Sequence, residues 1–245
     1  MKPGVILPAS ALAGRCKWFA EATAQGDAVQ SIQWLRGFAA LLVVAFHLSI
    51  APWGPSGVDV FFLISGFIMW ITTDQRELHP LAFYRNRLLR IIPLYWLYTT
   101  LLALAIIAIP AAFTRLHFDW SHLLTSYLFV PAVSPTNGLV TPFLVQGWSL
   151  NYEMFFYAVF GATLVLPARL RIAKLSASLL GLILLGVWLQ PASVVGQTYA
   201  DPLLAEFLAG VWIGWLWRRG ALRLPVPLAT LALIVAVAQG DCMNL

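Results

Sequence analysis

The stretch that decides the fold is WLRGFAALLVVAFHLSIAPW, residues 34–53, in which one arginine and one histidine interrupt an apolar run. Arg36 and His47 stand 11 residues apart. At about 100° per residue, this spacing returns to within roughly 20° of one helix face and separates the side chains by about 16 Å along the axis. If the helix crosses a bilayer, Arg36 lies near one surface and His47 lies deep inside. An ionisable group at membrane depth marks a functional site, so we expect chemistry here.

The composition is that of a polytopic membrane protein. Hydrophobic residues make up 60% of the chain, charged residues make up 10%, and the mean hydropathy is +0.81, whereas soluble domains have about 45–50% and 25%. The net charge of +5 comes from basic residues that lie between apolar runs, which is typical of topology signals and not of nucleic-acid binding. Cys16 and Cys242 lack metal-ligand spacing, so neither a metal site nor a disulfide framework is predicted.

The predicted fold class is all-α, a polytopic bundle of transmembrane helices. A span needs about 17–25 apolar residues. Seven stretches approach this length, at residues 37–52, 58–73, 93–113, 149–167, 175–189, 203–217 and 224–239. An eighth apolar stretch, residues 122–133, has only about a dozen residues, which favours a re-entrant or interfacial segment.

The basic residues give an independent test of the number of spans. With seven spans and a cytoplasmic N-terminus, every Lys and Arg except Arg115 falls on the cytoplasmic side, as the positive-inside rule requires. Residues 1–33 are then a cytoplasmic tail, with a cleaved signal peptide as the weaker alternative, and residues 34–245 are one membrane-embedded domain. Because an odd number of spans ends just before the last residue, we expect a chain that is truncated at its C-terminus.

A basic helix is predicted at residues 83–92, just before Pro93. Its arginines are Arg85, Arg87 and Arg90, and the last two are i, i+3 neighbours that can converge on one anion. The helix is either a positive-inside anchor on lipid phosphates or a phosphate-binding platform for a soluble cofactor, on the same membrane face as Arg36.

Two carboxylates are predicted near the outer surface. The Pro- and Gly-rich turn at residues 51–57 makes the first two spans a hairpin, so Asp59 enters the second span close to the depth of His47. There it would raise the basicity of the imidazole or cap its own helix, and the two roles are compatible. Glu153 lies about 7 Å below Trp148.

Asn151 and Tyr152 bring an amide and an aromatic face beside Glu153. This combination suits a sugar, although aromatic residues are also typical of an interfacial belt. Asp201 and Glu206 bracket the start of the sixth span, where helix capping accounts for them.

These segments together resemble the membrane-bound acyltransferase-3 family. The resemblance rests on four motifs in order, namely Arg36 and His47 with ten residues between them, GVDVFFLISGF at residues 57–67, RLLRIIPLY at residues 87–95 and WSLNYEMFFY at residues 148–157. The stretches IQWLRG at residues 32–37, IMW at 68–70 and NYE at 151–153 look most like the exopolysaccharide-production branch, which is similar to O-acetyltransferases of succinoglycan-type polymers. About seven of the roughly ten spans usual for the family are then present.

The resemblance implies an integral protein of the bacterial inner membrane that transfers an acetyl group from acetyl-CoA to a sugar hydroxyl of an exopolysaccharide or its lipid-linked precursor. It implies catalytic roles for His47, Arg36, Asp59 and Glu153, with His47 as general base or as transient acyl carrier. The residues implied to bind acetyl-CoA are Arg36, Arg85, Arg87 and Arg90. The residues implied to bind the sugar are Trp148, Asn151 and Tyr152.

Two other functions fit the residues alone. In a transporter or flippase of lipid-linked sugars, His47 and Asp59 would relay protons or coordinate the substrate. A non-catalytic scaffold of a polysaccharide assembly complex is the third hypothesis. Membrane lipid and a polysaccharide or lipid-linked sugar are the expected partners in each case.

Overall fold

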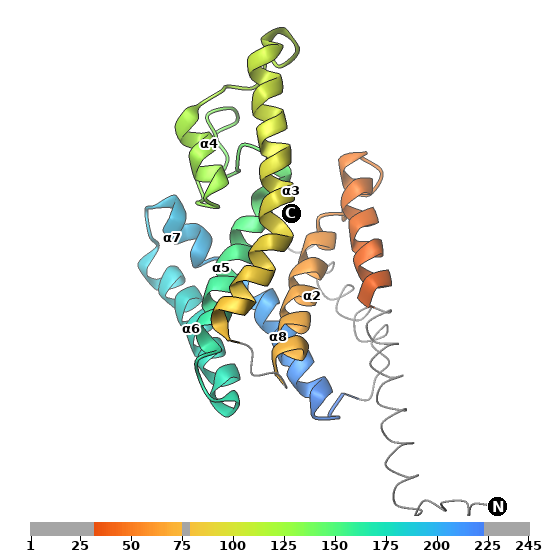
Figure 1. The fold of residues 1–245 in the computed structure, drawn as a ribbon, viewed down its shortest axis with the longest axis vertical. Helices are drawn as coiled ribbons and strands as arrows, with labels where there is room; N and C mark the ends of the chain where they lie inside the picture. Colours follow the sequence, from red (N-terminus) through yellow and green to blue (C-terminus); the bar gives the residue numbers. More distant parts are fainter. Residues whose placement is uncertain (1–31, 75–78, 223–245) are drawn as a thin grey trace, which may run out of the picture. The chain divides into compact units, whose positions relative to one another are not determined.

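A computed structural model describes residues 32–74 and 79–222. Within these ranges the regular structure is helical, with short 3-10 helices and one isolated β-bridge between Val133 and Val140, and turns and loops join these elements. The helices are Ile32–His47, α2 (Ser56–Thr73), α3 (Pro80–Ala108), α4 (Trp120–Tyr127), α5 (Trp148–Thr163), α6 (Ala168–Leu189), α7 (Val194–Tyr199) and α8 (Leu204–Arg218) (Figure 1). The chain divides into two compact units, with the boundary inside α2 after Phe61. The predicted all-helical fold class is confirmed.

The first unit contains the predicted hairpin. Its two arms are the helix Ile32–His47 and the beginning of α2. A Cβ on Gly57 would come within 2.5 Å of the Ala39 carbonyl oxygen and 2.9 Å of a Val43 methyl group. Only glycine therefore allows α2 to begin this close to the first helix.

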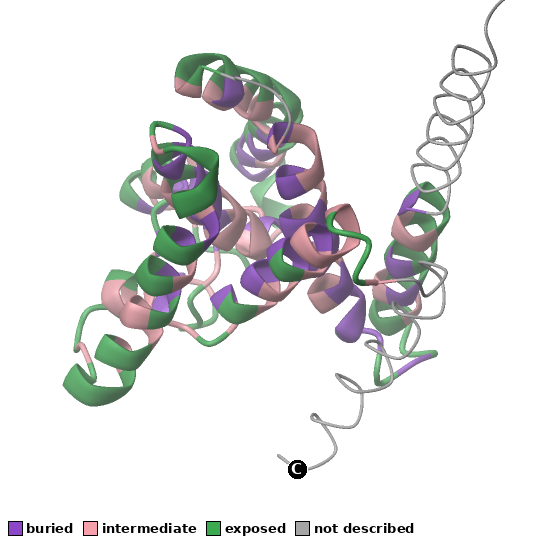
Figure 2. Cartoon of the chain, turned by 90° about the horizontal axis from the view of Figure 1, so that it is seen from below, coloured by how far each residue is buried: buried purple, intermediate pink, exposed green. Residues whose placement is uncertain are grey.

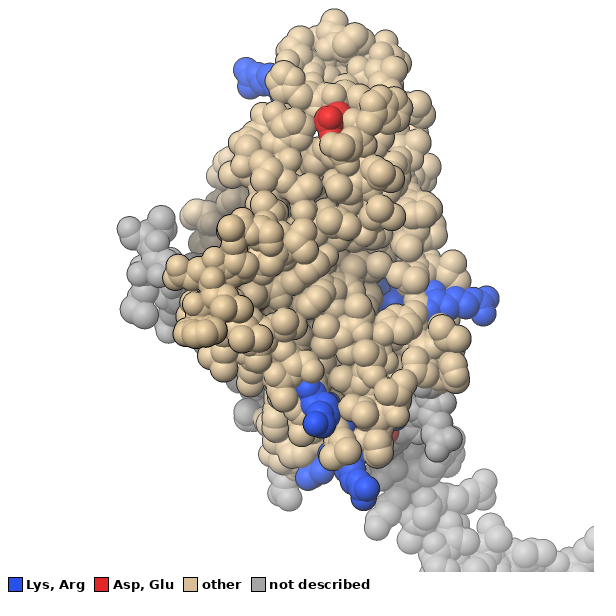
Figure 3. Space-filling model, turned by 90° about the vertical axis from the view of Figure 1, so that its left-hand side faces the viewer, with Lys and Arg blue, Asp and Glu red and all other residues tan. Residues whose placement is uncertain are grey.

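The second unit is a bundle in which α5 packs against α3 and α6, and α6 packs against α8. Two arginines hold the C-terminal end of α2, where helix carbonyls have no partner within the helix. Arg171 donates from Nη1 to the Thr73 carbonyl at 3.4 Å, and Arg218 donates from Nη2 to the Ile71 carbonyl at 2.9 Å. The first turns of α6 and the last turn of α8 thus meet at one end of the bundle. Figure 3 shows several Lys and Arg side chains gathered at the lower end of one face, with other basic groups at its right edge and upper left and an acidic group near its top.

Glycines allow α2 and α8 to pack with their backbones in contact. A Cβ on Gly66 would overlap the Phe207 carbonyl oxygen, and a Cβ on Gly210 would overlap the Leu63 carbonyl oxygen. Beside this contact the rings of Phe62 and Phe207 stack at 4.4 Å. Small residues at such crossings are typical of membrane helices, because close backbone packing replaces the hydrophobic effect as the driving force.

The outer faces of α3 and α6 are apolar. Figure 2 shows exposed residues along the outward sides of several helices. In α6, Leu184 and Trp188 are 68% and 79% exposed. Of the described helices, α2, α3 and α6 are long and apolar enough to cross a membrane. An apolar exterior of this kind is suited to lipid, so the protein is an integral membrane protein.

The structure changes several predicted boundaries. The basic stretch and the third predicted span form one 29-residue helix, α3, which contains Pro93 and ends at Ala108 rather than at residue 113. Proline is tolerated within membrane helices because neighbouring groups satisfy the freed carbonyl. The predicted spans at 149–167 and 203–217 appear as helices of 16 and 15 residues, α5 and α8. The tail up to residue 31 and the predicted span 224–239 lie outside the described residues.

The predicted non-spanning segment contains α4, which has eight residues. Hydrogen bonds hold it against α3 and the following loop. Trp96 donates from its indole to the Tyr127 carbonyl at 3.0 Å, and Nε2 of the buried His122 lies 2.8 Å from the Thr141 carbonyl. The segment is therefore a short, anchored helix and not a span, as its length predicts.

We expect the N-terminal cap of α4 to depend on pH. The Ser121 hydroxyl and then the His122 backbone N–H, each 2.6 Å from Asp119 Oδ1, hold the pKa of Asp119 below its usual value. Because the folded-state pKa is the lower one, this stabilisation is present above the ordinary aspartate pKa and is lost as pH falls through the folded-state value. We expect the amides of the first turn of α4 to exchange faster below about pH 4, after correction for intrinsic rates. Because asparagine does not titrate, amide exchange in the first turn of α4 should lose its pH dependence in Asp119→Asn. An acid response equal to that of the parent chain would contradict the role of Asp119.

Candidate functional site

The carboxylate of Glu153 lies where α2 and α5 meet. Its Oε1 accepts hydrogen bonds from the Ser65 hydroxyl of α2, at 3.1 Å, and from the Tyr157 hydroxyl, one turn further along α5. Two hydroxyl donors stabilise a carboxylate that is half-buried among apolar helices. Glu153, for which the sequence predicted no hydrogen-bond donor, therefore has two.

A third helix contributes a cation to the same place. The guanidinium carbon of Arg87 lies 5.7 Å from the ring centre of Phe83 and 6.0 Å from that of Tyr157. Distances of about 6 Å are typical of cation–π contacts. Arg87 and Glu153, both predicted from the sequence, thus contact the same tyrosine. We call Ser65, Arg87, Glu153 and Tyr157 the Glu153 cluster.

The packing of α3 against α5 fixes this arrangement. The Tyr84 hydroxyl donates to the Ala158 carbonyl at 2.9 Å, and a Cβ on Gly161 would come within 2.5 Å of the Tyr84 ring. Arg85 and Arg90 are exposed on the same helix, whereas Arg87 is half-buried. The three arginines therefore divide into one that points into the bundle and two that are accessible from outside.

The histidine predicted as the reactive group lies in the first unit, at the end of the helix Ile32–His47. Its Nδ1 is 2.8 Å from the Val43 carbonyl oxygen. Because a carbonyl oxygen only accepts, Nδ1 must donate the hydrogen, and the neutral ring then has its lone pair on Nε2. This tautomer leaves Nε2 as the atom that can take up a proton.

Arg36 and Asp59 are half-buried in the same unit. Since Gly57 lies beside Ala39 and the arms are antiparallel, each further residue of α2 moves about 1.5 Å away from the level of His47. Asp59 is therefore closer to the level of Arg36 than to that of His47, which differs from the shared depth that we expected. The register of the hairpin, which the sequence does not specify, causes the difference.

The predicted sugar-binding residues lie at the N-terminal end of α5. The ring centres of Trp148 and Tyr152 are 6.0 Å apart, and both rings contact Phe62 of α2. The Tyr152 hydroxyl lies 3.5 Å from Asp201 Oδ2, and Asn151 is buried. These residues are thus at the opposite end of α5 from its junction with the basic end of α6.

Sequence reasoning missed two members of the Glu153 cluster. Tyr157 is four residues after Glu153, and this spacing places both on one helix face, so the signal was available. Ser65 is within a quoted motif, but only the packing of α2 against α5 brings it to the carboxylate. Among residues 32–74 and 79–222, no three His, Cys, Asp or Glu side chains are placed to hold a metal ion.

Residues 29–240 match the family model described as an acyltransferase domain. Among curated proteins, the chain is 43% identical over 187 residues to the exopolysaccharide production protein ExoZ of Rhizobium meliloti. The aligned region covers 76% of this chain and 57% of that protein. It is 33% identical to the acyltransferase MdmB of Streptomyces mycarofaciens, over 53% of this chain and 38% of that protein. It is 25% identical to the peptidoglycan O-acetyltransferase OatA of Listeria monocytogenes, over 81% of this chain and 36% of that protein.

The chain therefore spans between 36% and 57% of the length of these three curated relatives. No solved structure matches it. The matched family region contains every residue of the Glu153 cluster and both halves of the Arg36 and His47 pair.

Proposed function

Because this chain belongs to the acyltransferase-3 family, we propose that it is a membrane O-acyltransferase that moves an acetyl group from acetyl-CoA to a sugar hydroxyl of an exopolysaccharide or its lipid-linked precursor. The observation that carries the proposal is the Glu153 cluster, in which a cation and a carboxylate from different helices contact one tyrosine. Ionisable groups brought together inside an apolar bundle are typical of a reaction site. The similarity to ExoZ, an exopolysaccharide production protein, and to OatA, a peptidoglycan O-acetyltransferase, supports a glycan as acceptor.

The donor would enter from the basic end of the bundle. Arg85 and Arg90 are exposed in the first turns of α3, where guanidinium groups can form charge-assisted hydrogen bonds to the phosphates of acetyl-CoA. Arg36 would contribute from the first helix. The same basic end would face the cytoplasm of the bacterial cell, with the protein in the inner membrane, because the positive-inside rule places Lys and Arg there.

His47 would act at the thioester through Nε2. As general base, Nε2 takes the proton of the sugar hydroxyl while the hydroxyl oxygen attacks the thioester carbonyl. The imidazolium then returns the proton to the departing thiolate of CoA. As acyl carrier, Nε2 itself attacks the thioester carbonyl, the carbon–sulfur bond breaks, and CoA leaves as its thiolate while the ring holds the acetyl group. The sugar hydroxyl then takes the acetyl group, its proton passes to Nε2, and the ring returns this proton to the thiolate.

Glu153, which accepts hydrogen bonds from Ser65 and Tyr157, would stabilise positive charge that develops during the transfer, and Asp59 would orient Arg36, to whose level it is closer. Trp148, Asn151 and Tyr152 would bind the sugar.

The experiment that tests the proposal follows both products of the transfer. Membranes that contain the chain are given acetyl-CoA labelled in its acetyl group and an O-deacetylated exopolysaccharide. We expect CoA thiol release in proportion to label in the polymer, and neither product with empty membranes. Movement of a lipid-linked sugar across the membrane without thiol release would overturn the proposal in favour of a transporter or flippase, and the absence of both activities would favour a scaffold.

The arginines of α3 should differ in their kinetic effects. We expect Arg90→Ala to raise the KM for acetyl-CoA about tenfold with little change in kcat, because an exposed phosphate contact contributes to ground-state binding. Arg87→Ala should also lower kcat, since Arg87 contacts the tyrosine that holds Glu153. Arg115→Ala, an exposed arginine outside the basic end, is the matched control. Equal KM values for acetyl-CoA in Arg90→Ala and Arg115→Ala would contradict the donor site.

A further inference from the structure

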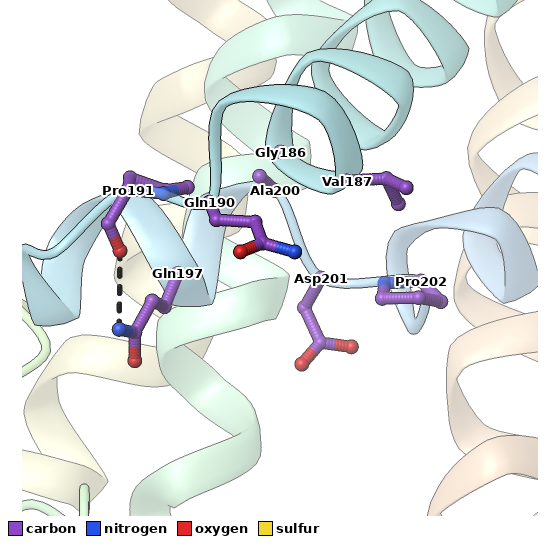
Figure 4. Close-up of a pocket in the computed structure, with 8 residues that line it drawn as sticks. All are labelled: Gly186, Val187, Gln190, Pro191, Gln197, Ala200, Asp201 and Pro202. Atoms are coloured by element: carbon purple, nitrogen blue, oxygen red, sulfur yellow. Dashed lines mark hydrogen bonds between the residues drawn. The ribbon is translucent and has the colours of Figure 1, made fainter.

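A small cavity lies between the beginning of α5 and the segment that contains α7. Its volume is about 170 Å³, and its walls include Trp148, Asn151, Tyr152, Gln197 and Asp201. A second, more open pocket of about 290 Å³ adjoins it and shares Gln197 and Asp201 (Figure 4). We call the smaller space the α7 cavity. Its polar lining and its open neighbour give it the form of a subsite for part of a longer ligand.

An unsatisfied polar atom points to a ligand in the α7 cavity. Asn151 is only 4% exposed, and its Oδ1 is buried without a hydrogen-bond partner among the described residues. A buried acceptor without a donor is costly, and each such group in a native structure requires an explanation. Since Asn151 lines the cavity, a hydroxyl of a bound ligand would supply the missing donor.

The other polar groups of the α7 cavity favour a polyhydroxylated ligand. Asp201 uses Oδ1 to accept from the Leu203 N–H at 2.8 Å, whereas among the described residues its Oδ2 has only the long contact with the Tyr152 hydroxyl at 3.5 Å. The Gln197 side chain donates to the Pro191 carbonyl at 3.1 Å (Figure 4), which leaves its amide oxygen as an acceptor. Trp148 adds a flat apolar wall. Acceptor oxygens beside an aromatic face match the hydroxyls and the apolar face of a pyranose ring.

The segment with α7 is held rigidly enough to select a ligand. The rings of Phe155 and Tyr199 stack at 4.3 Å with planes 10° apart, and the Tyr199 hydroxyl donates to the Phe129 carbonyl at 3.2 Å. Ser193 caps the start of α7 by accepting from the Gly196 N–H. Side chains on a segment that is fixed at both ends lose little entropy on binding, which favours specificity.

We propose that the α7 cavity binds one neutral pyranose ring of the acceptor glycan and that Gln197 and Asp201 select this ring. The inference rests on the proposed function and extends the acceptor site to the segment with α7. The acceptor residues predicted from the sequence all lie in α5. The carboxylate of Asp201 disfavours an acidic sugar here, because like charges repel. At about 170 Å³ the cavity suits one ring, and the pocket in Figure 4 leaves room for the next unit of the chain.

The test measures the KM for the acceptor separately from the KM for acetyl-CoA. In Asn151→Leu and in Asp201→Asn, which keeps an oxygen for the Leu203 N–H, we expect the KM for a neutral acceptor oligosaccharide to rise about tenfold, as for the loss of a buried hydrogen bond. The KM for acetyl-CoA should stay unchanged. Gln146→Ala, an exposed amide just before α5, is the matched control and should have the acceptor KM of the parent chain.

The outcomes separate the two proposals. If the parent chain releases no CoA with any glycan acceptor, the proposed function fails. If the parent chain is active but both cavity variants keep its acceptor KM, the α7 cavity is not an acceptor subsite and the proposed function stands. In Asp201→Asn, an improved relative use of an oligosaccharide with an acidic ring would show directly that this residue selects the sugar, whereas an unchanged preference would overturn the selective role.

Discussion

Replacement of His47 by alanine is expected to lower the rate of acetyl transfer by about 10²–10⁴-fold, the usual contribution of a general acid–base group. The structure gives the physical reason for this expectation. The Val43 carbonyl accepts from Nδ1 at 2.8 Å and so keeps the lone pair of the neutral ring on Nε2. Alanine removes this atom but retains the helix, because it is a strong helix former. The measurement is label transfer to the polymer at equal membrane abundance of the two proteins.

A histidine outside the proposed site gives the control. His117 is exposed in the loop before α4, and its backbone N–H, rather than its ring, binds Thr136. His117→Ala should therefore transfer acetyl groups at the rate of the parent chain. Normal acetyl content of the polymer with His47→Ala would refute the role of His47.

The two proposed roles of His47 predict different behaviour without an acceptor. An acyl carrier should accumulate one labelled acetyl group on the protein, which hydroxylamine removes, whereas a general base should leave the protein unlabelled. Both roles require Nε2, so both are lost in His47→Ala. The labelling experiment therefore chooses between mechanisms that the sequence left open.

The sequence predicts the helical class well because the apolar runs are long and the basic residues lie between them. It predicts the boundaries less well. Pro93 indicates an interruption, but it lies inside the single helix α3, since packing in a bundle outweighs the local preference of one residue. The basic residues Arg171 and Arg218, predicted only as topology signals, also satisfy carbonyls at the end of α2. Such a contact depends on tertiary structure and has no local signal.

The candidate site shows the same division between local and tertiary information. Asp201 accepts from the Leu203 N–H in the turn just before α8. The N-cap residue of α8 is Leu203, which makes no side-chain cap, so a turn that precedes the helix takes the place of the predicted cap. The contact of Asp201 with Tyr152 and its place in the α7 cavity join residues about fifty positions apart, which no periodicity reveals. Ser65 is bonded to Glu153 across helices in the same way.

A second large effect is expected from the helix crossing of α2 and α8. In Gly210→Leu the new Cβ would overlap the Leu63 carbonyl oxygen. A backbone atom has no rotamer into which it can move, so the two helices would have to separate and lose the stacking of Phe62 on Phe207. Overpacking of a tight contact costs about 1–3 kcal/mol and occasionally more, and we expect the upper end of this range or beyond.

The unfolding of purified protein in mild detergent measures this loss, and the chain offers a matched control for it. Gly181 lies inside α6, and a Cβ there would meet no atom within 4 Å. Gly181→Leu should therefore leave the midpoint of unfolding unchanged or raise it slightly, because glycine is the poorer helix former by about 1 kcal/mol. Gly210→Ala, which adds only the overlapping Cβ, should fall between Gly210→Leu and the parent chain. If Gly210→Leu and Gly181→Leu unfolded at the same midpoint, the contact between α2 and α8 would not be what holds these helices together, and the position of Ser65 beside Glu153 would need another explanation.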